Sequence, residues 1–354
     1  MSGPAPTSIA RPDILTLQPY EHALWDPTLE RLHANELPWR SSGDTSAAGL
    51  NRYPEPQPRD LVQQLASLYE QPVANVLVTR GSDEAIDLLT RAFCRAGIDQ
   101  VLVCPPTFGM YAVAATVQGA GVVRVPLRHL QDFAYDTSAV LAACTPTVKL
   151  VYVCSPNNPT GNLVPEPVIL HLADQLAGTA LLVVDEAYIE FAGVASCARH
   201  LPDHPWLVVL RTLSKAYGLA GARCGVVLAH AEVIALLRRI IEPYNMAQLS
   251  IEAVLRALQP VARAITHEYV ALIQNERAQL AAALSGSDAV VRVWPSAANF
   301  LLVEFKDPQQ ALERARAAGL LVRDVRRQPA LERALRLTVG TPQQNQRLIA
   351  ALVC

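Results

Sequence analysis

Seven short apolar runs separated by helix-like segments constrain the fold of this chain more than any other feature. Each run is apolar throughout and does not alternate with polar residues, which is typical of strands buried on both faces of a sheet. Strands that alternate with helices form βαβ units and a mainly parallel sheet. The runs are NVLVT (75–79), QVLVC (100–104), GVVRVPL (121–127), KLVYVC (149–154), ALLVVDEAY (180–188), WLVVLRT (206–212) and GVVLA (225–229).

The last third of the chain carries a second, smaller set of strands and helices. Residues 231–284 are helix-like throughout apart from a break at EPYN (242–245), and short strands follow them. We therefore expect a large domain over 53–245 and a small α+β domain over 246–354. Residues 1–52, rich in Pro, Ser and Gly, are expected to form an arm or lid that packs with the small domain. The strands expected in the small domain are VVRVW (290–294), NFLLVEF (299–305), LLVRDV (320–325) and ALRLTV (334–339).

The composition favours a compact globular protein and argues against several classes of partner. About half of the 354 residues are apolar, 18% are charged, and the formal net charge is −2. Without a polybasic run, neither a nucleic acid nor a membrane surface is expected as a partner. The seven cysteines include no CxxC pair, so neither a disulfide framework nor a metal site is expected. The first residues lack the apolar core of a signal peptide, and a cytoplasmic location is expected.

Polar residues follow several of the runs, at the edge where a doubly wound sheet binds its ligands. Ser82 and Asp83 open the helix after NVLVT, where free N–H groups and the helix dipole suit a phosphate, although an ordinary N-cap explains them equally well. Asn158 lies in a segment that suits a tight turn, and turn formation alone is a sufficient reason for it. The aromatic residues of PPTFGMY (105–111) are more typical of core than of ligand contacts.

Three charged residues give a stronger signal, because each of them follows or approaches a buried strand end. Asp185 ends the run ALLVV, and a buried carboxylate needs a partner. Lys215 follows the next strand along the chain, about one βαβ step later. Arg223 lies among glycines that allow the backbone to approach a ligand closely. Their joint position predicts a cleft in which a carboxylate, an amine and a guanidinium meet.

A series of segments matches one known family in unbroken order. They are LNRYPEPQP (50–58), RGSDEAIDLLTRAFC (80–94), CPPTFGMY (104–111), VYVCSPNNPTG (151–161), VVDEAYIEF (183–191), RTLSKAYGLAGARCG (211–225) and ALRLTVGT (334–341). This series resembles the class II pyridoxal-phosphate-dependent aminotransferases of fold type I, and among them the histidinol-phosphate aminotransferases. The resemblance implies an α/β fold in which helices flank a mainly parallel seven-stranded sheet, with a smaller α+β domain beside it.

The resemblance also assigns catalytic roles around the cofactor, pyridoxal 5'-phosphate. It implies that Lys215 forms an imine with the cofactor aldehyde and later moves the substrate α-proton. Asp185 would pair with the pyridine nitrogen and keep it protonated. Asn158 and Tyr188 would hydrogen-bond the ring hydroxyl oxygen.

Further residues would hold the cofactor ring and phosphate by the same resemblance. Phe108 corresponds to the aromatic residue that stacks on the ring, where the family commonly has tyrosine. Tyr53 would reach the phosphate from a neighbouring subunit, which implies a homodimer with shared sites. The residues expected to bind the phosphate within one chain are Ser82, Asp83, Ser214 and Arg223.

Two arginines of the small domain bear on the substrate. Arg336 matches the position that binds the carboxylate of the amino donor, and its guanidinium fork suits a phosphate equally well. Arg323 matches a second position suited to the substrate phosphate, although Arg326 and Arg327 make its neighbourhood generally basic. Tyr20 resembles a residue of the family's lid over the substrate.

The implied reaction transfers an amino group between glutamate and imidazole-acetol phosphate, which gives histidinol phosphate and 2-oxoglutarate in histidine biosynthesis. Two enzymes of the same fold remain alternatives: an aromatic amino-acid aminotransferase and a threonine-phosphate decarboxylase. A cofactor-binding regulatory sensor is a more distant alternative, because the roughly 50 residues before the large domain are too few for a DNA-binding domain. A doubly wound sheet that binds no cofactor is the remaining alternative.

Overall fold

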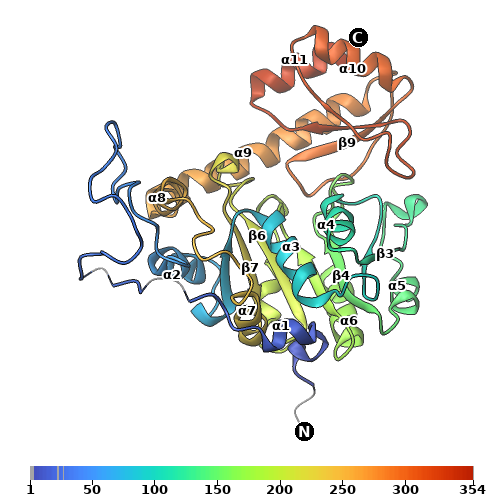
Figure 1. The fold of residues 1–354 in the computed structure, drawn as a ribbon. Helices are drawn as coiled ribbons and strands as arrows, with labels where there is room; N and C mark the ends of the chain where they lie inside the picture. Colours follow the sequence, from blue (N-terminus) through green and yellow to red (C-terminus); the bar gives the residue numbers. More distant parts are fainter. Residues whose placement is uncertain (1–3, 22–23, 27, 354) are drawn as a thin grey trace.

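A seven-stranded sheet forms the centre of the protein, and the computed structural model describes residues 4–21, 24–26 and 28–353 (Figure 1). The strand order is β1-β7-β6-β5-β4-β2-β3. Strand β7 pairs antiparallel with both β1 and β6, whereas the other pairs are parallel, which confirms the predicted mainly parallel sheet. The strands are β1 (Val76–Thr79), β2 (Gln100–Val103), β3 (Gly121–Arg124), β4 (Val148–Cys154), β5 (Leu181–Asp185), β6 (Leu207–Thr212) and β7 (Gly225–Ala229).

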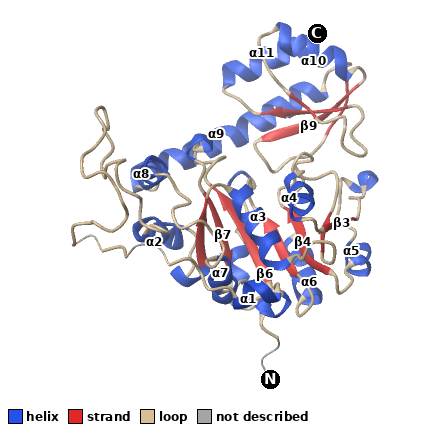
Figure 2. Cartoon of the chain, in the orientation of Figure 1, coloured by secondary structure: helices blue, strands red, loops and turns tan. Residues whose placement is uncertain are grey.

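Helices cover both faces of this sheet, which explains why its strands are apolar throughout (Figure 2). Successive side chains of a strand point to opposite faces. In β1, Val76 and Val78 lie in the core on one face and Leu77 lies in the core on the other. Each buried Val or Leu contributes about 1.5–3 kcal/mol. The first core is covered by α2 (Arg59–Leu68), α5 (Thr137–Ala143), α6 (Glu166–Leu176) and α8 (Gln248–Ala257), the second by α3 (Ser82–Phe93), α4 (Met110–Gln118) and α7 (Ala231–Leu237).

A four-stranded antiparallel sheet of order β10-β11-β9-β8 forms a second, smaller unit. Helix α9 (Pro260–Ser285) runs from beside α8 to this sheet, as Figure 1 shows. The core of this small unit contains Leu280 and Leu284 of α9. The remaining elements are β8 (Val290–Val293), β9 (Phe300–Phe305), β10 (Arg323–Asp324), β11 (Ala334–Thr338), α10 (Pro308–Ala317) and α11 (Pro342–Val353).

Two predicted elements differ from the structure in their extent. The break predicted at 242–245 is present but extends over 238–247, and a second break, which was not predicted, lies where Pro260 starts a new helix after α8. The predicted strand 320–325 is reduced to the two residues of β10, which lies at the edge of its sheet. Short edge strands of this kind limit pairing with other chains. The proposed domain boundaries at residues 52 and 245 stay predictions.

The N-terminal residues attach to the large sheet unit at the ends of its helices. The short helices η1 (Pro6–Ile9) and α1 (Pro12–Thr16) are held where the Arg11 N–H donates to the Ala92 carbonyl and Arg239 Nη1 donates to the Leu15 carbonyl. The described part of 18–58 contains no helix or strand, and its Ala47 and Ala48 N–H groups donate to Glu252 of α8. This arm extends along the outside of the molecule beside α2 and α8 (Figure 1).

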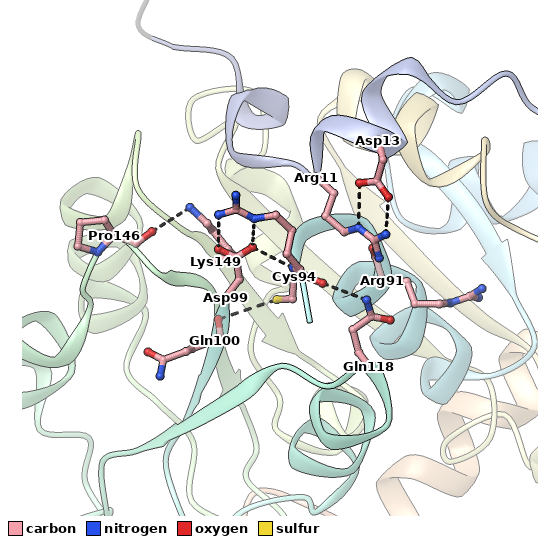
Figure 3. Close-up of polar contacts among 10 residues, drawn as sticks. Arg11, Asp13, Arg91, Cys94, Asp99, Gln100, Gln118, Pro146 and Lys149 are labelled. Carbon is pink, nitrogen blue, oxygen red and sulfur yellow. Dashed lines mark hydrogen bonds and ion pairs between the residues drawn. The ribbon is translucent and has the colours of Figure 1, made fainter. Parts of the chain in front are cut away.

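The amino ends of the strands carry a network of paired charges and hydrogen bonds (Figure 3). Arg95 forms a bidentate contact with Asp99, which directly precedes β2. Arg11 Nη1 donates to the Arg91 carbonyl at 3.1 Å, and Lys149 Nζ donates to the Pro146 carbonyl at 2.8 Å. The charged groups of Arg11, Arg95, Asp99 and Lys149 at this edge therefore have hydrogen-bond partners within the protein.

Two kinds of feature are absent from the described ranges, a membrane-spanning helix and a cluster of metal-binding side chains. No helix among the described residues is both long and apolar enough to cross a membrane. The same part of the chain holds no group of three His, Cys, Asp or Glu side chains that could bind a metal ion.

Candidate active site

A cleft of about 560 Å³ lies at the opposite edge of the large sheet, where the parallel strands end and the small sheet unit approaches. The two units meet there, because Arg336 Nη1 of β11 donates to Asn158 Oδ1 at 2.5 Å and both residues line the cleft. All the predicted site residues except Tyr20 and Tyr53 line this cleft. They are Ser82, Asp83, Phe108, Asn158, Asp185, Tyr188, Ser214, Lys215, Arg223, Arg323 and Arg336.

Tyr20 and Tyr53 lie outside the cleft of the single chain. Tyr20 lines a larger cavity of about 770 Å³ between the arm and α2, together with Trp25 and Arg238. This larger cavity lacks the strand-end carboxylate and lysine, so we place the chemistry in the smaller one. Tyr53 is half exposed and stacks on Tyr244 with 4.6 Å between ring centroids. The predicted contacts of both tyrosines stay predictions.

Asp185 occupies the floor of the cleft as the last residue of β5, and it is buried. Tyr111 Oη donates to its Oδ2 at 2.7 Å, and the Ala187 N–H donates to its Oδ1 at 3.1 Å. Burial raises the pKa of Asp185, while these two donors and the nearby Lys215 oppose the rise. A carboxylate held in this way is ready to accept a cationic N–H donor.

Lys215 follows β6 and projects into the same cleft. It is exposed to the space of the cleft, yet the surrounding walls partly desolvate its ammonium group. This desolvation lowers the pKa of Lys215, Arg336 lowers it further, and Asp185 opposes the shift. Lys215 Nζ lies 5.4 Å from the centroid of the Tyr188 ring. A lysine with a lowered pKa keeps more of its amine neutral, which suits a nucleophile or a base.

The start of α3 forms a cradle for an anion. Gly81 precedes α3 with φ of +78° and provides no side-chain cap, so the N–H groups of the first turn have no acceptor of this kind. A Cβ on Gly225 would lie 2.5 Å from the Ser82 nitrogen, so only glycine allows β7 to approach this closely. Arg223 adopts a left-handed conformation with φ of +54°, and its Nη2 donates to Asp83 Oδ2 at 3.1 Å.

Asn158, Tyr188 and Arg336 connect the two units across the cleft. Asn158 Nδ2 donates to Tyr188 Oη at 3.3 Å, and Arg336 Nη1 donates to Asn158 Oδ1 at 2.5 Å. Arg336 Nε is buried without a hydrogen-bond partner, and its guanidinium lies 5.2 Å from the Phe300 ring centroid. Burial raises the pKa of Tyr188 well above its ordinary value, which keeps its hydroxyl protonated.

The basic residues around β10 differ in their surroundings. Arg323 lies opposite Arg336 in the β10–β11 register, and both line the cleft. Arg326 forms an ion pair with Asp324 at 2.7 Å and does not line the cleft. Neither Arg323 nor Arg336 forms a salt bridge with a described acidic side chain. Arg323 is therefore better placed than Arg326 to receive an anionic ligand.

Tyr111 makes a contact with the site that the sequence does not predict. The aromatic residues of its segment are typical of core, and Tyr111 is indeed fully buried. Its hydroxyl nevertheless reaches Asp185, and its ring meets Phe108 edge to face at 5.6 Å. The available signal was that a buried tyrosine hydroxyl needs a hydrogen-bond partner, and a strand-end carboxylate was the obvious candidate.

Glu186 and Arg211 form a second contact behind the site that the sequence did not predict. Arg211 is buried, lies 3.6 Å from Glu186 and forms a 2.7 Å ion pair with Glu190. The Cys197 N–H donates to Glu186 Oε1 at 2.7 Å. These contacts fix the segment after β5 from the side that faces away from the cleft.

Comparisons with known proteins agree with this geometry. The model of the family "Aminotransferase class I and II" matches residues 32–352. The chain is 50% identical over 323 residues to a histidinol-phosphate aminotransferase of Xylella fastidiosa. The aligned region covers 91% of this chain and 88% of that protein.

Two solved structures share the fold. The histidinol-phosphate aminotransferase of Sinorhizobium meliloti in complex with pyridoxal-5'-phosphate is 28% identical, with a TM-score of 0.78 over 86% of this chain and 83% of that chain. The L-threonine-O-3-phosphate decarboxylase of Porphyromonas gingivalis is 26% identical, with a TM-score of 0.73 over 86% of this chain and 93% of that chain. The chain therefore belongs to the class I and II aminotransferase family.

Proposed function

We propose that this chain is a histidinol-phosphate aminotransferase, which transfers an amino group reversibly between glutamate and imidazole-acetol phosphate. The observation that carries the proposal is the pair Arg323 and Arg336, two guanidinium groups that line the cleft without an acidic partner among the described residues. A small dianionic substrate group fits two such forks better than one. The 50% identity to a relative of that name supports the same substrate.

The cofactor is pyridoxal 5'-phosphate, and the residues present fit it. The start of α3, with Ser214 and Arg223, would hold the phosphate, because its first turn has no side-chain cap and a Cβ at Gly81 would lie 2.7 Å from Arg223 Nη2, so the cradle needs a residue without a side chain there. Asp185 would accept the N–H of the ring nitrogen, and the face of Phe108 would cover the ring. When bound, the cofactor supplies an aldehyde that carries the amino group and a protonated ring that accepts the electron pair left by the α-proton.

The chain's own residues then control protons and orientation. Lys215, with its lowered pKa, would bind the cofactor aldehyde and, once freed, take the α-proton on Nζ. Asp185 would keep the ring nitrogen protonated through a charge-assisted hydrogen bond. Asn158 and Tyr188, already bonded to each other, would donate to the ring oxygen. Arg336 would orient the substrate from the small sheet unit.

We also propose a cytoplasmic homodimer in which Tyr53 of one chain reaches the cofactor phosphate of the other. The support for the dimer is a set of large apolar side chains on the arm and on α9 that are exposed in the single chain. They include Leu32, Trp39, Val261 and Tyr269.

The experiment is a steady-state assay with glutamate as donor and a panel of acceptors. We expect imidazole-acetol phosphate to give the highest kcat/KM and phenylpyruvate a much lower one. Preferred turnover of phenylpyruvate would identify an aromatic amino-acid aminotransferase instead. Release of carbon dioxide from threonine phosphate would identify a decarboxylase. That activity is an alternative because the chain is similar in structure to the Porphyromonas gingivalis decarboxylase.

A further inference from the structure

The phenol of Tyr111 is held rigidly under the floor of the cleft. Tyr111 lies in the first turn of α4 and is completely buried. Its ring stacks on the ring of Tyr152 with 4.5 Å between centroids and 8° between planes. Phe108 contacts it edge to face, at 5.6 Å and 82°. Because two aromatic neighbours hold the ring, the phenol oxygen is kept 2.7 Å from Asp185 Oδ2, with Cys154 as a second neighbour.

The hydrogen bond between Tyr111 and Asp185 has a fixed direction. Burial and the neighbouring carboxylate raise the pKa of Tyr111 well above its ordinary value of 10.0, so the phenol keeps its proton. An ionised carboxylate can only accept, so Tyr111 is the donor. With the Ala187 N–H on Oδ1, each oxygen of Asp185 has one donor from the protein. Each oxygen can still accept one more donor, such as a ring N–H.

We propose that Tyr111 is a positioning residue, which orients the Asp185 carboxylate and favours its ionised form for pairing with the cofactor's ring nitrogen. The inference rests on the role proposed above for Asp185. A neutral donor favours the charged form of a buried carboxylate, and it does so without adding a charge that would compete with the ring nitrogen. A lysine or arginine in the same place would neutralise Asp185 and weaken its attraction for a protonated ring.

The other contacts of Asp185 do not replace this function. The Ala187 N–H is two residues away in the same segment and holds only Oδ1. Lys215 acts on Asp185 through its charge, and no hydrogen bond joins the two side chains among the described contacts. Without the Tyr111 hydroxyl, Oδ2 would be left with no donor from the protein. A buried carboxylate that loses a donor becomes easier to protonate and freer to rotate.

The test measures equilibrium binding of pyridoxamine 5'-phosphate and of inorganic phosphate to the cofactor-stripped protein and its variants. Pyridoxamine phosphate presents the ring nitrogen but cannot form an imine with Lys215. Tyr111→Phe removes only the hydroxyl. Tyr152→Phe is the matched control, because it removes a buried hydroxyl from the same aromatic stack. The one hydrogen-bond partner of that hydroxyl among the described residues is Thr90, at 3.5 Å.

We expect Tyr111→Phe to weaken pyridoxamine phosphate binding about tenfold or more, which is typical of losing a hydrogen bond to a charged group. Binding of inorganic phosphate should not change, because the anion cradle is untouched. In the holoenzyme, kcat should fall while KM for glutamate stays the same. Tyr152→Phe should alter none of these values. Equal losses in Tyr111→Phe and Tyr152→Phe, or no loss in Tyr111→Phe, would overturn the inference.

Asp185→Ala separates this inference from the proposed function. If Asp185→Ala weakens pyridoxamine phosphate binding and Tyr111→Phe adds little in that background, the two residues act as one unit. If Asp185→Ala weakens binding but Tyr111→Phe has its full effect in that background, the inference about Tyr111 is wrong and the role of Asp185 stands. If Asp185→Ala leaves ring binding intact, the role of Asp185 is wrong, and that of Tyr111 falls with it.

Discussion

The two edges of the large sheet differ in how their cationic side chains are paired. At the amino ends of the strands, Arg95 is paired with Asp99 and Lys149 is bonded to a carbonyl (Figure 3). At the carboxyl ends, Arg323, Arg336 and Lys215 line one cleft, and none of them forms a salt bridge with a described acidic side chain. Cations that are left unpaired in a concave site attract anions. The amino-end edge therefore stabilises the fold, and the carboxyl-end edge is free to bind ligands.

The largest expected effect follows from removing the amine of the carboxyl-end edge. Lys215→Ala should lower the rate of transamination by about a thousandfold or more, because no other amine lines the cleft among the described residues. Cofactor affinity should persist in part through the phosphate cradle. Single-turnover rates and a dialysis measurement of bound cofactor check both points. Turnover close to that of the wild type would contradict the assignment of Lys215.

The second largest effect is expected from adding a side chain at Gly225, where the backbone of β7 packs against the start of α3. Gly225→Ala would place a Cβ 2.4 Å from the Gly81 carbonyl carbon, so α3 or β7 must move. We expect the Kd for pyridoxal 5'-phosphate to rise roughly a hundredfold, since several charge-assisted bonds to the phosphate depend on this geometry. Gly286→Ala is the control, because its Cβ would meet nothing closer than 3.7 Å. Equal Kd values in the two variants would disprove the claim that the start of α3 binds the cofactor phosphate.

Arg336→Ala should have a smaller effect, which lowers kcat/KM for the substrates and leaves cofactor affinity unchanged. We expect kcat/KM to fall about ten- to a hundredfold in both half-reactions, because one guanidinium would serve the glutamate carboxylate and the substrate phosphate. Arg326→Ala is the matched control, since Arg326 is paired with Asp324 outside the cleft. A loss confined to one half-reaction would show that the two anions use different sites.

The smallest effect on activity is expected at the amino-end edge. Asp99→Ala breaks the contact with Arg95 and should lower the free energy of unfolding by about 1–3 kcal/mol. Cofactor affinity and kcat should not change. Urea unfolding and cofactor titration of the same variant separate the two quantities. A loss of cofactor affinity comparable to that of Gly225→Ala would contradict the claim that the amino-end edge acts on stability and not on ligand binding.

The same residue gives a pH dependence with a defined sign. Hydrogen bonds from Arg95 oppose burial and leave the pKa of Asp99 below its ordinary value of 3.8. A lowered folded pKa means that the stabilisation is present above about pH 3.8 and is lost as the pH falls through the folded pKa. The stability difference between the wild type and Asp99→Ala should therefore shrink below about pH 3.8. A difference that stays constant in acid would contradict the pairing.

The contrast between the edges also separates what the sequence predicts from what it does not. Apolar runs predict the buried strands, and residues directly after them, such as Asp185 and Lys215, predict the cleft, because parallel strands end at one edge. The donor of Asp185 could not be predicted in this way. Tyr111 comes from α4, which packs against β2 and β3, and its hydroxyl reaches the carboxylate of β5 only because its ring extends across to stack on Tyr152 of β4.

Element extents were predicted less well for a related reason. The break predicted at 242–245 is present but longer, because Pro243 and the contacts of Asn245 with Val78 and Glu84 hold the segment between α7 and α8 in another conformation. Such long-range contacts override local preference. The roles predicted for Tyr20 and Tyr53 depend on substrate and on a second chain, so the sequence and a single chain both leave them as predictions.

The most direct test of the central claim follows the two half-reactions of the wild-type holoenzyme separately by the absorbance of its cofactor. Excess glutamate should convert the cofactor from its aldehyde form to its amine form. Imidazole-acetol phosphate should then return it to the aldehyde form, with release of histidinol phosphate. Conversion by glutamate followed by no response to imidazole-acetol phosphate would contradict the claim that the unpaired cations of the cleft serve a phosphorylated imidazole substrate.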